Sequence, residues 1–194
     1  MEKNKVTDSE LLKIVDELNE TKHSDDHHGA ARSGLKGEAQ LRNILAEHGI
    51  PLLRTQANFK EYYNTLSKKQ AVEISREKMK LTCPWQSSCY YEPDGYIPTT
   101  DTTVEIKYGR SHGTTEEKIF LDLEKIRDGV YPSNLTYIFW GTPEEYTDSG
   151  RCFAQIFADK CKEENLSVEV VFATRNNGVE LTRWIEKQVN KSTR

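Results

Sequence analysis

The chain has 194 residues, of which 36% are hydrophobic and 30% are charged, and its formal net charge is −4. A chain of this length is typical of one folded domain that buries roughly 70% of its unfolded surface. The longest apolar runs, YIFW and VEVVFA, are too short to span a bilayer, and the charged N-terminal segment lacks the apolar core of a signal peptide. We therefore expect a cytoplasmic protein without membrane contact.

The first predicted element is a helix over residues 8–20. Thr7 and Glu10 have the spacing of a capping box, and one apolar stripe follows, formed by Leu11, Ile14, Val15 and Leu18. The stretch TKHSDDHHGAARSG that follows is predicted to be a loop, in which the histidines and aspartates either bind a metal or form a polar connector. We assign residues 1–30 to this helix and connector, and residues 31–194 to the main domain.

A second helix is predicted over residues 35–48, because Leu41, Ile44 and Leu45 repeat at helical spacing and Gly49 is suited to a C′ position. The stretch PLLRTQANF that follows it is expected to be the first strand or an extended entry to it. Residues 60–80 are predicted to form one polar helix, with four side chains as candidates for burial: Tyr62, Leu66, Ala71 and Ile74.

The rest of the chain alternates between predicted strands and helices. A hairpin at 92–109 is followed by a helix at 115–128, a strand at 135–140, a helix at 150–163, a strand at 167–173 and a helix at 179–190. Trp140 and Trp184 are expected in the core. Strands joined by helical crossovers run parallel. The order predicts an α/β fold with a mixed central β-sheet flanked by helices.

The hairpin carries the residues that indicate chemistry. In VEIKY, apolar and polar side chains alternate, so Glu105 and Lys107 share the face opposite the core. Pro98 and Asp101 favour a chain reversal that brings Asp94 across from Glu105. Two converging carboxylates repel each other unless a hard cation such as Mg²⁺ lies between them. Such a cation polarises a phosphoryl oxygen and activates water, which indicates phosphodiester hydrolysis.

Pro93-Asp94, followed eleven residues later by Glu105-Ile106-Lys107, resembles the signature of the PD-(D/E)XK nuclease superfamily. The resemblance implies that Asp94, Glu105 and the backbone carbonyl of Ile106 bind Mg²⁺, with one or two ions per active site. It also implies that Lys107 is the catalytic lysine.

The resemblance covers roughly residues 35–140 and implies a restriction-endonuclease-like αβββαβ core. Within this superfamily the chain is most similar to type II restriction endonucleases, which are homodimers that cut double-stranded DNA at a specific site and leave 5′-phosphate and 3′-hydroxyl ends. Glu38 is either a further metal ligand or an ordinary acidic residue near a helix start. Two alternatives stay open: a DNA repair or junction-specific nuclease of the same fold, and a non-catalytic DNA-binding protein.

Nine further polar side chains are candidates for DNA binding: Arg110, Ser111, His112, Thr114, Thr115, Lys118, Arg76, Lys78 and Lys80. The alternative for each is a place in a loop, a helix cap or a solvated helix face. Trp85, Tyr90 and Tyr91 either stack on bases or pack under the sheet.

Two further features leave alternatives open. The four cysteines are either reduced thiols or zinc ligands, and neither pair has the two-residue gap of a zinc knuckle. The apolar stripe of the helix at 8–20 either contributes to a homodimer interface or caps one end of the sheet.

Overall fold

The computed structural model describes residues 29–85, 88–108, 114–140, 153–173 and 178–192. Its main sheet has four strands in the order β3-β4-β5-β6, with the bounds Gly95–Ile97, Thr102–Tyr108, Leu135–Trp140 and Val168–Ala173. A separate ribbon pairs β1 (Leu81–Thr82) with β2 (Tyr90–Tyr91). The described residues form six helices: α2 (Gly29–Glu47), α3 (Gln56–Tyr62), α4 (Lys68–Met79), α5 (Thr114–Arg127), α6 (Phe153–Glu163) and α7 (Gly178–Ser192).

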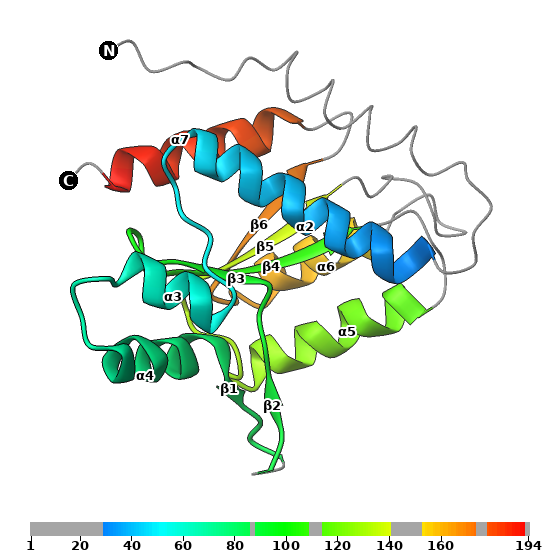
Figure 1. Ribbon diagram of the computed structural model, residues 1–194. Coiled ribbons are helices and arrows are strands. Elements are labelled where there is room, and N and C mark those ends of the chain that lie inside the picture. Colours follow the sequence, from blue (N-terminus) through cyan, green and yellow to red (C-terminus); the bar gives the residue numbers. More distant parts are fainter. Residues whose placement is uncertain (1–28, 86–87, 109–113, 141–152, 174–177, 193–194) are drawn as a thin grey trace.

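Helices cover both faces of the main sheet (Figure 1). Strands β4, β5 and β6 are parallel, with α5 and α6 as the connecting crossovers, and β3 is antiparallel to β4. Parallel strands joined by helices are covered on both sides, so each strand carries apolar side chains in both directions. The predicted mixed α/β sheet is confirmed, as are the parallel later strands.

Two apolar clusters lie on opposite faces of the sheet. One joins α2 and α7 to the sheet and includes Val104, Ile106 and Trp140, and it also contains Trp184 at 2% exposure. The other joins α5 and α6 to the opposite face and includes Tyr137. The predicted core positions of Trp140 and Trp184 are therefore confirmed. The second cluster covers the face on which Glu105 and Lys107 lie.

The β3–β4 hairpin has the predicted reversal. Residues 98–101 form its turn, in which Asp101 has a φ of 49°, a left-handed conformation that aspartate tolerates better than most residues. The register pairs Gly95 with Val104. A Cβ on Gly95 would lie 2.5 Å from the Leu52 side chain, so a larger residue here would displace that buried leucine.

Three predicted elements differ from the structure. Helix α2 begins at Gly29, inside the predicted loop and six residues before the predicted start at residue 35. The predicted first strand at 51–59 is reduced, in the described residues, to an isolated bridge between Leu53 and Tyr96, because Thr55 caps helix α3 directly afterwards.

The predicted single helix over 60–80 is two helices. Ser67 ends the break between them in a capping box: its side chain accepts a hydrogen bond from the Gln70 backbone N–H, and the Gln70 side chain accepts one from the Ser67 backbone N–H. Tyr62 and Leu66 lie beside this break and are 39% and 38% exposed, so their predicted burial is wrong. Ala71 is buried as predicted.

Within the described ranges, no helix combines the length and the apolar character that a membrane crossing requires.

Candidate active site

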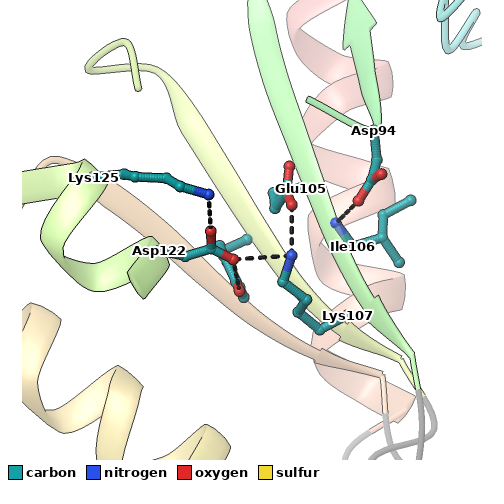
Figure 2. A network of polar contacts seen from close by, with 7 residues as sticks. Asp94, Glu105, Ile106, Lys107, Asp122 and Lys125 are labelled. Carbon is teal, nitrogen blue, oxygen red and sulfur yellow. Dashed lines mark hydrogen bonds and ion pairs between the residues drawn. The ribbon is translucent and has the colours of Figure 1, made fainter. Parts of the chain in front are cut away.

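The hairpin brings Asp94 to the edge of strand β4. The Asp94 carboxylate accepts a hydrogen bond from the backbone N–H of Ile106, with 2.7 Å between Oδ2 and N (Figure 2). Continuing the β3–β4 register by one residue beyond Gly95 sets Asp94 opposite Glu105, as predicted. The Asp94 side chain therefore accepts a hydrogen bond from a backbone N–H of β4 that would have bonded to the backbone of β3 if β3 were longer.

Glu105 and Lys107 project from the face of β4 that carries helix α5. The Lys107 ammonium lies 2.6 Å from Glu105 Oε1, so its side chain folds back along the strand. Glu105 is only 6% exposed, which contradicts the expectation that this face lies outside the core. The reason is the crossover helix α5, which covers that face of the sheet.

Helix α5 supplies a third carboxylate, Asp122, that the sequence reading missed. Asp122 Oδ2 lies 2.9 Å from the Lys107 ammonium and accepts a hydrogen bond from the Tyr137 hydroxyl, and Oδ1 lies 2.7 Å from the ammonium of Lys125. Figure 2 shows the Lys107 ammonium between Glu105 and Asp122. Lys125 also lies 4.0 Å from the centre of the Tyr91 ring. These side chains form a buried network of alternating charge.

Burial and charge shift the pKa values of the network in different directions. Burial raises the pKa of Glu105 to about 7, although the Lys107 ammonium acts against this. Burial also raises the pKa of Asp94, and the positive charges of Lys107 and Arg54 oppose the rise only in part. Burial acts to raise the pKa of Asp122 as well, but the two ammonium groups outweigh it and lower that pKa.

Lys107 has the opposite balance. Burial acts to lower the pKa of its ammonium, but the carboxylates of Glu105 and Asp122 raise that pKa above its usual range. Lys107 is therefore protonated at neutral pH. Its positive charge lies where it offsets the mutual repulsion of the surrounding carboxylates.

Glu38 lies on helix α2 and forms an ion pair with Arg54, which precedes α3. The Glu38 side chain is 14% exposed and that of Arg54 is 37% exposed. Arg54 is also close enough to Asp94 for its charge to influence the pKa of that carboxyl group. The structure thus brings Glu38 to the neighbourhood of the hairpin site, with a guanidinium as its partner.

The residues present are compatible with one divalent cation. Glu105 Oε2 is buried and has no hydrogen-bond partner among the described side chains, although the Tyr131 hydroxyl lies close enough for Glu105 to raise the pKa of that hydroxyl. One carboxylate oxygen of Glu105 is therefore free to bind a cation. The hairpin register, continued two residues beyond Gly95, sets Pro93 opposite Ile106. Proline has no N–H to donate to the Ile106 carbonyl, so that oxygen is also left without a ladder donor.

Two carboxylates and one carbonyl are the oxygen ligands that Mg²⁺ accepts, with water completing its coordination. In the part of the chain that the structure describes, there is no group of three or more His, Cys, Asp or Glu side chains arranged to hold a metal. A cation here would therefore depend on Asp94, Glu105 and the backbone.

The predicted DNA-binding residues have varied surroundings. Arg76, Lys80 and Lys118 are exposed, and Lys80 lies 4.2 Å from the centre of the Tyr90 ring. Lys78 forms an ion pair with Asp101, with 2.9 Å between Nζ and Oδ1. Thr114 and Thr115 are the first residues of α5. Arg110, Ser111 and His112 lie outside the described residues, as do the predicted helix at 8–20 and residues 21–28 of its connector.

Two of the aromatic residues before the hairpin are exposed. Trp85 and Tyr90 are 53% and 51% exposed, so of the two alternatives for them, packing under the sheet is wrong, because β1 and β2 form a ribbon separate from the main sheet. Tyr91 is partly buried against the α5–α6 cluster. Cys83, Cys89 and Cys161 carry free thiols, and Cys152 lies outside the described residues.

Comparison of the chain with protein-family models, curated proteins and solved structures gave no match. The functional assignment therefore rests on the geometry and chemistry of this site.

Proposed function

We propose that the protein is a Mg²⁺-dependent, sequence-specific endonuclease that hydrolyses phosphodiester bonds of double-stranded DNA, similar to type II restriction enzymes. One observation carries the proposal. Asp94 and Glu105 lie opposite each other in the continued hairpin register, close enough for the Asp94 charge to raise the pKa of Glu105, beside a protonated lysine and with one Glu105 oxygen buried and unpartnered. A buried acceptor without a partner is costly in a folded protein, and a bound cation removes that cost.

The order of elements also supports membership of the PD-(D/E)XK superfamily. Helix α2 precedes the β3–β4 hairpin, and α5 and β5 follow it. The bridge between Leu53 and Tyr96 lies where the first strand of the αβββαβ core is expected. On this proposal that strand is shortened to a single bridge, and the rest of the core is retained.

The roles of the side chains follow from their charges. Asp94 and Glu105, together with the Ile106 carbonyl, would hold Mg²⁺, which supplies charge stabilisation at the phosphate and activates water when bound. Lys107 donates hydrogen bonds from its protonated ammonium, either to the attacking water or to a phosphate oxygen. The ion pair with Asp122 keeps the Lys107 ammonium at this position when Glu105 binds the cation.

Surface groups near the β1–β2 ribbon suit a nucleic-acid ligand. The ribbon extends away from the main sheet (Figure 1). Its exposed Trp85 and Tyr90 offer rings for stacking, and Lys80 and Arg76 offer charges for phosphates. These groups give a local site for DNA despite the net charge of −4. A homodimer, with each protomer cutting one strand, completes the proposal, and sedimentation of the free protein tests it.

The proposed function is tested by incubating the purified protein with phage DNA and following the products on a gel. Mg²⁺ should give discrete fragments, Ca²⁺ should support binding without cutting, and EDTA should abolish cutting. Glu105→Gln is the matched inactive variant, since it keeps the size of the side chain and removes the charge. Discrete fragments indicate a sequence-specific enzyme, whereas nicks only at mismatches or junctions indicate a repair nuclease. Undiminished cutting in EDTA would overturn the proposal.

A further inference from the structure

The surroundings of Glu38 bear on how many cations the site holds. Glu38 is paired with the Arg54 guanidinium, and only 14% of its side chain is exposed. In the described chain, Glu38 does not combine with Asp94 and Glu105 into a group of three acidic ligands. The positive charge beside Glu38 is therefore the Arg54 guanidinium, which belongs to the protein itself.

The formal charge of the group also favours one divalent cation over two. Four carboxylates (Glu38, Asp94, Glu105 and Asp122) lie among three cationic side chains (Arg54, Lys107 and Lys125), so the whole group carries one formal negative charge. One divalent cation changes this to one positive charge. A second would raise it to three positive charges in largely buried surroundings, where like charges repel strongly.

We propose that the Arg54 guanidinium occupies the place that a second divalent cation would take. The centre then holds one ion, bound through Asp94 and Glu105, and Glu38 is a partner of Arg54 instead of a metal ligand. This inference rests on the proposed function, because it concerns the cation of the same site. An arginine suits this role because it stays charged at any physiological pH and pairs with a carboxylate through fixed donors.

The test is the number of Mn²⁺ ions bound per chain, measured by calorimetry and by the electron paramagnetic resonance of free Mn²⁺. The wild-type protein should bind one ion. Glu105→Gln should weaken that binding by about 100-fold or more, whereas Glu38→Gln should leave the count at one and the affinity within about twofold, since only the first removes a ligand. Glu38→Gln is the matched control because it makes the same chemical change on a neighbouring carboxylate.

Arg54→Ala provides the second arm. Without the guanidinium, Glu38 is an unpaired carboxylate beside the site, and a second Mn²⁺ should bind. Arg183→Ala, at an exposed arginine of α7, should keep the count at one. Circular dichroism of each variant checks that it is folded, and the double variant Arg54→Ala/Glu38→Gln should return to one ion, which ties the second ion to Glu38.

The outcomes separate the inference from the proposed function. Two ions in the wild type, one of them lost in Glu38→Gln, would overturn the inference and leave the nuclease proposal intact. A single ion in Arg54→Ala would likewise overturn it, because Arg54 would not be what excludes the second ion. Absence of any Mn²⁺ binding by the wild type, together with absence of DNA cleavage, would overturn both.

Discussion

Removing the Asp122 carboxylate should destabilise the protein more than any surface substitution on the same helix. Asp122 is 2% exposed and accepts from Lys107, Lys125 and the Tyr137 hydroxyl. In Asp122→Asn, Lys107 keeps Glu105 as a partner, 2.6 Å away. The Lys125 ammonium loses the charge of the Asp122 carboxylate and keeps its contact with the Tyr91 ring.

The expected magnitude follows from that loss. Breaking a buried ion pair from one side costs about 3–5 kcal/mol, because it leaves an uncompensated charge. This is a large part of the roughly 5–15 kcal/mol by which domains of this kind are stable. The double variant Asp122→Asn/Lys125→Met should recover about 1–2 kcal/mol relative to Asp122→Asn, since it removes the orphaned ammonium while retaining most of its apolar stem.

Urea unfolding followed by circular dichroism at neutral pH measures these differences. Glu124→Gln is the control on the same helix. Glu124 pairs with Arg127, which retains Glu164, so its substitution should leave the free energy of unfolding unchanged within error. The reasoning is refuted if Asp122→Asn is no less stable than Glu124→Gln, or if adding Lys125→Met destabilises it further.

Three other predictions follow from the same residues. The pKa of Glu105 is raised from 4.5 to about 7, so in EDTA the stability contributed by its protonated form is present below pH 4.5 and is lost as the pH rises through 7. The free energy of unfolding of the wild type, relative to that of Glu105→Gln, should therefore fall between pH 5 and pH 8. Urea unfolding measures this difference, and a difference that does not change with pH would contradict the prediction. The affinity for duplex DNA in Ca²⁺, measured by fluorescence anisotropy, should fall steeply between about 50 and 200 mM salt, and a flat response would exclude a basic DNA face. Trp85→Ala should weaken that affinity by roughly 1–3 kcal/mol if the ring stacks on a base, with unchanged thermal stability, whereas equal affinity would exclude the ribbon from the interface.

The hairpin was predictable because its signals are local. Alternation in VEIKY sets which side chains share a face, and the turn residues around Asp101 set the reversal, so the placement of Asp94 opposite Glu105 followed from a short stretch of chain. The same holds for β5, whose predicted bounds at 135–140 are those of the structure. The break at Ser67 also had a local signal, the capping box SKKQ, which the sequence reading passed over.

The burial of Glu105 and the role of Asp122 depend on contacts between distant elements. Helix α5 covers Glu105 only because β4 and β5 are parallel and the crossover has to pack on one face of the sheet. A sequence signal for Asp122 does exist. It falls with Ile119, Leu123 and Ile126 at the spacing of one buried helical stripe, and a carboxylate in such a stripe indicates a buried partner.

Helix α2 illustrates a different difficulty. Its first turns contain Gly29 and Gly34, which lower helix propensity, and the polar composition around them is typical of a loop. The structure continues the helix through both glycines. Propensity is a weak guide where the rest of an element fixes the conformation, so the start of this helix was not predictable from its own residues.

The most direct test of the account is a crystal structure of the protein soaked in Mn²⁺, with an anomalous difference map. The account predicts one peak between the carboxylates of Asp94 and Glu105, next to the Ile106 carbonyl, with the Lys107 ammonium moved from Glu105 and still in contact with Asp122. A map without a peak at this position, with the Lys107 ammonium still bonded to Glu105, would contradict it.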